Sequence, residues 1–138
     1  MKRSAALALV VACGAPAAPK PTAPRPEKDI QLNTPGALVN VEAGLVPGYV
    51  TVIDFWSESC GACHVVGAML TKGVADEPLI LIRKVDVGDA FTPVAEAYQI
   101  GALPHYRVYD KRGRMRYVLM GNDCTKAPEI AKRLVAEP

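Results

Sequence analysis

The feature that most constrains the fold is a long apolar run that ends just before two closely spaced cysteines. Residues 49–56 are mostly β-branched or aromatic and follow a Pro-Gly pair, which predicts a buried central strand. From residue 60 to about residue 74, apolar side chains recur at helical spacing. Cys60 and Cys63 are therefore expected where a buried strand turns into a helix.

The rest of the chain also alternates between strand and helix patterns. The segment between Gly36 and Gly48 is too short for a full helix, so we expect the first helix to be reduced or absent. Further elements are predicted as a strand at 79–87, a helix at 90–98, a hairpin of strands 106–109 and 115–120 turning at Gly113, and a closing helix at 125–136 with Thr125 as its N-cap. The order β-α-β-α-β-β-α predicts an α/β domain, a central mixed β-sheet with helices on both faces.

The N-terminal part of the chain has a different composition. Lys2 and Arg3 precede an apolar run at residues 5–12, which is too short to span a bilayer as a helix and is typical of an export signal. Residues 15–28 are rich in proline and alanine and contain no large apolar side chain. Proline favours extended polyproline geometry, so this segment predicts a semi-stiff tether.

The end of the apolar run carries a second signal. Val10-Val11-Ala12-Cys13 resembles the lipobox of bacterial lipoproteins, in which the signal is cut before a cysteine that is then acylated. The resemblance implies a lipidated Cys13, a membrane anchor and a location facing the periplasm. Gly14 is not the aspartate associated with inner-membrane retention, which favours the outer membrane. We therefore expect a signal peptide at 1–12, a lipidated tether at 13–28 and a folded domain at 29–138.

The charge and the cysteine content argue against two classes of protein, nucleic-acid-binding proteins and disulfide-stabilised scaffolds. The chain has 16 basic and 14 acidic residues, and Lys2 and Arg3 account for the difference. A domain without net charge gives no reason to expect nucleic-acid binding. Its four cysteines are too few and too unevenly spaced for a disulfide scaffold, so each is expected to have its own role.

The Cys60-Gly61-Ala62-Cys63 motif can support redox chemistry at the predicted strand–helix junction. Free N–H groups and the helix dipole at a helix N-terminus stabilise negative charge, and so favour a Cys60 thiolate, the nucleophilic form. Cys63 lies one helical turn further on and can attack a mixed disulfide formed at Cys60. The small residues Gly61 and Ala62 leave the first sulfur open.

Other interpretations of the motif remain. A zinc site would need a second pair of cysteine or histidine ligands, and none follows at ligand spacing. Cys60-x-x-Cys63-His64 also fits the c-type haem attachment pattern, with Met115 or Met120 as a candidate axial ligand. A purely structural disulfide would explain the two cysteines but not the residues around them.

Several further motifs identify a family. Residues 52–63, with Asp54 and Trp56, resemble the active-site segment of thioredoxins, and residues 98–104 resemble the segment that leads to their cis-proline. Lys84, Asp86 and Gly121 also match, and the resemblance covers about residues 30–137. It implies a thioredoxin fold and a protein thiol–disulfide oxidoreductase.

The resemblance assigns roles to residues of this chain. Cys60 is the nucleophile, Cys63 resolves the mixed disulfide, and the two cysteines form the redox disulfide. Asp54 transfers a proton, paired with Lys84; independently, burial in an apolar strand would raise the pKa of this carboxyl. Leu103 pairs through its backbone with the substrate, next to a cis Pro104. The substrate surface is implied to comprise Trp56, Gly61, Ala62, Leu103, Pro104, His105 and Gly121.

The chain also departs from the family pattern. The dipeptide between the cysteines is Gly-Ala rather than Gly-Pro, and Ser59 replaces the usual second tryptophan. His64 stands where a lysine is common, and acts either on the thiolate or as a solvated helix residue. His105 replaces a threonine and could contact substrate or tune Cys60. Cys124 is either a third redox thiol or a small buried residue.

These observations predict a membrane-tethered, extracytoplasmic exchanger. It would act as a monomer on protein thiols and disulfides with an unidentified redox partner, and without a cofactor or metal. A redox-silent binding module on the same scaffold is the alternative, because a fold does not determine a function.

Overall fold

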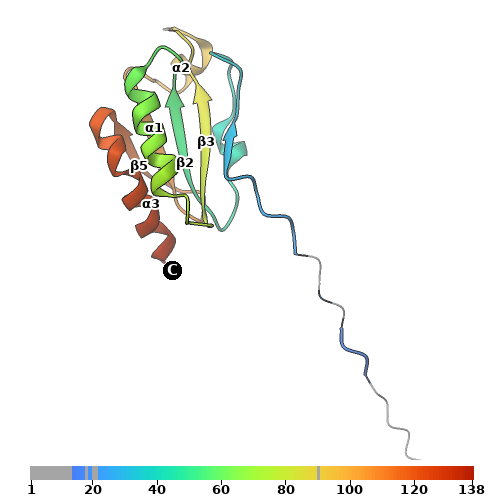
Figure 1. The fold of residues 1–138 in the computed structure, drawn as a ribbon. Coiled ribbons are helices and arrows are strands. Elements are labelled where there is room, and N and C mark those ends of the chain that lie inside the picture. Colours follow the sequence, from blue (N-terminus) through green and yellow to red (C-terminus); the bar gives the residue numbers. More distant parts are fainter. Residues whose placement is uncertain (1–13, 18, 20–21, 90) are drawn as a thin grey trace, which may run out of the picture.

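The structure, a computed structural model, describes residues 14–17, 19, 22–89 and 91–138 (Figure 1). Five strands form one mixed sheet in the order β1-β3-β2-β4-β5, with β1, β2 and β3 parallel and β4 and β5 antiparallel to their neighbours. The strands are β1 (Asp29–Gln31), β2 (Val50–Trp56), β3 (Ile80–Asp86), β4 (His105–Tyr109) and β5 (Met115–Met120). The helices are α1 (Gly61–Gly73), α2 (Pro93–Ala97) and α3 (Ala127–Ala136), with 3-10 turns η1 (Val41–Gly44) and η2 (Gly121–Lys126).

Alternation along β2 builds a core on each face of the sheet. Val50 and Val52 pack in a cluster with buried residues of α1 and α3, which lie together on one face (Figure 1). Ile53 and Phe55 point the other way, into a smaller cluster with residues of η1 and α2. The α/β prediction of helices on both faces is therefore confirmed. The reduced first helix is confirmed as well, since among the described residues the one helical segment before β2 is the short turn η1.

Two local predictions were wrong. The predicted element order lacked β1, because three residues, two of them exposed, are too few to show a periodic pattern. Thr125 is not the N-cap of the last helix, which begins at Ala127 after Lys126, without a side-chain cap. Thr125 lies instead in η2, where its hydroxyl donates to the carbonyl of Asn122 at 2.7 Å.

The described part of the tether leaves the sheet at one end. The amide of Ile82 donates to the carbonyl of Lys28 at 2.7 Å, and the Lys28 ammonium donates to the carbonyl of Glu77 at 2.6 Å. The chain thus enters β1 from the side where β3 begins, opposite to the strand ends that lead to the cysteine pair (Figure 1). The predicted signal peptide and Cys13 lie outside the described residues. No helix among the described residues is long and apolar enough to cross a membrane.

The buried guanidinium of Arg83 joins three segments at this end. The side chain is 2 % exposed and donates to the carbonyls of Gly44, Glu27 and Ile82 at 2.9–3.0 Å. Burial lowers the pKa of this guanidinium. Arg83 therefore holds Glu27, at the end of the predicted tether, and the last residue of η1 against β3.

Replacing Arg83 with methionine is expected to destabilise the domain by about 2 kcal/mol, since three carbonyl groups lose their buried donor. Urea denaturation measures this change. Lys72→Met, at an exposed position of α1, is the matched control and should stay within about 0.5 kcal/mol of the wild type. An Arg83→Met protein as stable as the control would show that the guanidinium does not secure the tether.

Candidate active site

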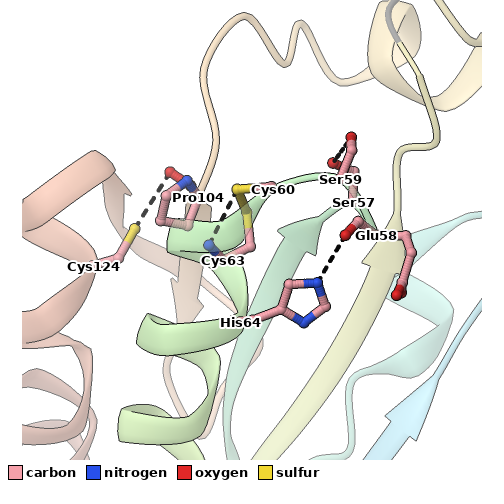
Figure 2. Close-up of a disulfide and its surroundings, with 8 residues drawn as sticks. All are labelled: Ser57, Glu58, Ser59, Cys60, Cys63, His64, Pro104 and Cys124. Atoms are coloured by element: carbon pink, nitrogen blue, oxygen red, sulfur yellow. Dashed lines mark hydrogen bonds between the residues drawn. A yellow bond between two sulfur atoms is a disulfide. The ribbon is translucent and has the colours of Figure 1, made fainter.

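Cys60 is the N-cap of α1, directly after the loop that leaves β2. Its backbone is extended (φ −90°, ψ 96°), and its Sγ accepts the amide of Cys63 at 3.1 Å (Figure 2). Its carbonyl accepts the amide of His64 at 3.3 Å. The sulfur is therefore placed at the positive end of the helix dipole, where a thiolate is stabilised.

Cys60 and Cys63 form a disulfide whose two sulfurs differ in accessibility. The Cα atoms lie 5.2 Å apart, and Figure 2 shows the bond at the first turn of α1. Cys60 is half-buried with exposed Gly61 and Ala62 beside it, whereas Cys63 is only 3 % exposed. A partner molecule can reach Cys60 but not Cys63, as the predicted division into nucleophile and resolving residue requires.

Asp54 is an unusual carboxyl in the middle of β2. It is 2 % exposed, and its Oδ1 has no hydrogen-bond partner among the described residues. Burial raises its pKa to about 7, against the opposing effect of the Lys84 ammonium. A hollow of about 190 Å³ is lined by Asp54, Cys63 and Lys84, among others. A carboxyl that titrates near neutral pH can therefore exchange a proton with Cys63 once the disulfide is reduced.

The loop before β4 supplies the other side of the site. The Leu103–Pro104 peptide bond is cis, as predicted. The amide of Gly121, which has a positive φ of 56°, donates to the carbonyl of Pro104 at 2.9 Å. Leu103 lines a surface hollow together with Ser59, the residue before Cys60. The fold thus brings Leu103 next to the loop that ends at Cys60, and Gly121 next to Pro104.

Comparison with known proteins agrees with this geometry. The family model for thioredoxin matches residues 45–134. The chain belongs to the thioredoxin family. It is 37 % identical over 60 residues to a thioredoxin of Mycoplasma pneumoniae, covering 44 % of this chain and 58 % of that one, less than two thirds of its length. It is 31 % identical over 94 residues to a thioredoxin of Coprinus comatus, covering 64 % and 84 % of the two chains.

Solved thioredoxin structures share the fold. Oxidised mitochondrial thioredoxin 3 of Saccharomyces cerevisiae superimposes with a TM-score of 0.51 at 27 % identity, covering 61 % of this chain and 77 % of that one. The reduced thioredoxin pre-protein of Schistosoma mansoni gives 0.61 at 23 % identity, covering 78 % and 99 %, which shows the fold alone. With its paired cysteines, this thioredoxin-family chain is a thiol–disulfide oxidoreductase.

Lys84 was expected to pair with Asp54, but its ammonium lies over the ring of Trp56. It is the register neighbour of Asp54 across β2 and β3, yet no ion pair within 4.0 Å joins them in the described part of the chain. Its ammonium lies 4.6 Å from the ring centroid of Trp56. Trp56 is also fixed by a hydrogen bond from its Nε1 to Gln31 at 3.1 Å. Lys84 therefore acts on Asp54 through the local field rather than by direct pairing.

His105 does not contact the cysteine pair. It stands opposite Phe55 in the strand register, and the two rings meet edge-on at 5.5 Å in the core beneath α2 and η1. Its Nε2 accepts from Arg107 at 3.3 Å, and burial and this guanidinium lower its pKa to about 4. The expected contact with substrate or with Cys60 is wrong because position 105 points to the sheet face opposite α1.

His64 and Cys124 both have structural partners. The His64 and Trp56 rings form a T-shaped pair with centroids 5.6 Å apart. The Nε2 of His64 donates to the carbonyl of Glu58 at 2.9 Å, which holds the loop before Cys60 (Figure 2). The Cys124 thiol is fully buried, 3.4 Å from the carbonyl of Leu119, and burial raises its pKa to about 12. The buried alternative for Cys124 is the one that the structure supports, because such a thiol remains protonated and inaccessible.

The sequence interpretation missed the hollow that Leu103 lines. Its volume is about 620 Å³, and it includes Phe91 and Gln99 from the region around α2. The available signal was Phe91 itself, an aromatic residue within an otherwise polar and proline-containing loop.

Proposed function

We propose that this chain is a membrane-tethered, extracytoplasmic thioredoxin-type oxidoreductase that exchanges disulfides with protein substrates. The observation that carries the proposal is an accessible Cys60 at the start of α1, backed by the buried Cys63. The family match supports the exchange chemistry. The lipobox-like segment and the proline-rich tether support the location.

The exchange is a balanced two-electron reaction. In the reduced protein the Cys60 thiolate attacks a substrate disulfide, forms a mixed disulfide and releases one substrate thiolate, which takes up a proton from water. Cys63 then gives its proton to the Asp54 carboxylate and attacks the sulfur of Cys60. The second substrate thiolate leaves and is protonated, so the substrate is reduced and the cysteine pair is oxidised. A dithiol partner reverses the change in the protein.

The position of the tether suits an enzyme anchored to a membrane. Residues 22–27 lead away from the sheet at the end opposite the cysteine pair. In polyproline geometry, a tether of residues 13–28 extends by about 3.1 Å per residue, or roughly 50 Å in all. A lipid on Cys13 would thus hold the domain clear of the membrane, with Cys60 facing away from it.

The anchor is tested by replacing Cys13 with serine. In a bacterium that processes lipoproteins, we expect the wild-type protein in the membrane fraction, with a mature N-terminal peptide that begins at Cys13 and carries acyl mass. Cys13→Ser should leave the membrane fraction, since stable attachment requires the buried acyl chains. Cys124→Ala, which also removes one thiol, should stay with the membranes. An unmodified Cys13 in the mature wild-type chain would contradict the anchor.

A further inference from the structure

A groove extends from Ser59, the residue before Cys60, towards α2. The hollow of about 620 Å³ shares Ser57, Ser59, Gly88 and Asp89 with a second hollow of about 520 Å³. The two are therefore continuous, and we call them the side groove. Because Ser59 directly precedes Cys60 and Leu103 lines the first hollow, a chain bound at Cys60 would pass along this groove.

Two residues that line the side groove have an unfavourable, left-handed backbone conformation. Phe91 is 88 % exposed and has a φ of 65°, and Gln99 has a φ of 55°. They are the non-glycine residues with positive φ in the described part of the chain, and both line the side groove. A left-handed backbone is unfavourable for a bulky residue, and such positions concentrate at functional sites. The exposed Phe91 ring is not part of a hydrophobic core. A bound partner could therefore cover it.

The charge of the side groove has one sign. Asp89 and Glu96 line the first hollow, and Glu58 and Asp86 line the second. No lysine or arginine is among the described residues that line either hollow. Carboxylates around a recess attract cations and repel anions, and salt weakens the effect. The side groove therefore complements a segment that is both apolar and basic.

We propose that the side groove selects disulfide substrates that carry an apolar residue and an arginine or lysine close to the target cysteine. The apolar side chain packs against Phe91, and the cation lies between Asp89 and Glu96. This inference rests on the exchange function proposed above and adds its substrate class. Phe91 thus supplies an apolar contact on a docking surface where Ser59 replaces a tryptophan.

Single-turnover reduction of matched peptides tests the substrate class. Pre-reduced full-length protein is mixed with short peptides whose single cysteine is disulfide-linked to 2-mercaptoethanol, with Leu-Arg or Leu-Glu beside that cysteine. Peptide thiol and 2-mercaptoethanol are released as Cys60–Cys63 forms, so electrons balance without another reductant. At an ionic strength of about 10 mM we expect the Leu-Arg peptide to react about tenfold faster, and at about 0.5 M this ratio should fall below about threefold.

Variants assign the preference to particular side chains. Asp89→Asn with Glu96→Gln should bring the two peptide rates within about twofold. Asp76→Asn with Glu129→Gln removes two exposed carboxylates outside the groove and should preserve the full ratio. Phe91→Asn keeps a residue that tolerates positive φ, and should slow Leu-Arg about fivefold, to the rate of a Ser-Arg peptide.

Two results would overturn the inference while the exchange function stands: equal rates for the two peptides at low salt, or a preference that survives in the Asp89→Asn, Glu96→Gln variant. Hydroxyethyl disulfide, which is small and uncharged, separates the two levels. If the reduced wild-type protein reacts neither with hydroxyethyl disulfide nor with the peptides, the exchange function itself is wrong. The proposed substrate class is then wrong too.

Discussion

Replacing Cys60 with serine is expected to lower the rate of disulfide exchange by at least about a thousandfold. A hydroxyl at this position is not ionised near neutral pH and does not attack sulfur, and the remaining thiols cannot substitute for it. Cys63 is 3 % exposed and Cys124 is fully buried. Reduction of insulin in the presence of dithiothreitol measures the loss.

Two further variants define the roles within the pair. Cys63→Ser should still attack a substrate but remain attached to it, because the residue that resolves the mixed disulfide is missing. Mass spectrometry detects that adduct. Cys124→Ala should keep exchange within about threefold of the wild type, since its thiol is buried and protonated. A Cys60→Ser protein that keeps a tenth of the activity would assign the nucleophile to another residue.

Replacing Asp54 with asparagine is expected to stabilise the oxidised protein above neutral pH by up to about 4 kcal/mol. Burial raises the pKa of Asp54 to about 7 in the folded protein, against an ordinary value of 3.8 for an aspartate. Between these pH values the folded state holds a proton that the unfolded state has lost. The free energy of unfolding of the wild type therefore decreases as the pH rises from about 4 to about 7, because Asp54 must ionise in a buried site. Asparagine does not ionise and so avoids this decrease.

Urea denaturation of both proteins from pH 4 to pH 8 measures this effect. His105 has a lowered pKa, so its contribution to stability decreases as the pH falls below about 6.5. Because both proteins contain His105, their difference isolates Asp54. Asp123→Asn, at an exposed carboxyl paired with Lys126, should follow the wild-type curve. An Asp54→Asn protein less stable than the wild type at pH 8 would contradict a charged, buried Asp54.

The same variant should slow exchange near neutral pH. In the proposed exchange the Asp54 carboxylate accepts the proton of Cys63, with which it lines one hollow, and asparagine cannot accept that proton. We expect about a tenfold to hundredfold slower release of substrate, in the range of general base catalysis. Single-turnover kinetics that follow the decay of the mixed disulfide measure this step, and an unchanged decay rate would exclude Asp54 from it.

The side groove and the end of the tether lie at opposite ends of the domain. The reacting sulfur, the Leu103–Pro104 bond and the side groove lie at the same end of the molecule, so the residues that we propose to hold a substrate are close to the atom that would attack it. The tether is secured at the opposite end by Lys28 and Arg83. The proposed membrane attachment and the proposed substrate docking would therefore use separate surfaces.

The sequence by itself determined the features that depend on local pattern. A run of β-branched residues followed by helical spacing was sufficient to predict β2, α1 and the place of Cys60 at their junction, because strand and helix periods are properties of neighbouring residues. The cis Pro104 and the buried Asp54 followed from resemblance and from the apolar surroundings in the chain. The anchor at Cys13 stays a prediction.

Only the tertiary structure decided the features that depend on pairing between distant segments. His105 points away from α1 because the register of β4 against β2 places it opposite Phe55. Lys84 lies over Trp56 because β2 and β3 bring their side chains onto one face. The side groove forms where the loop before Cys60 meets residues 87–103, which are separated from it by α1 and β3. Such contacts carry no periodic signal, since they join residues that are neighbours only after folding.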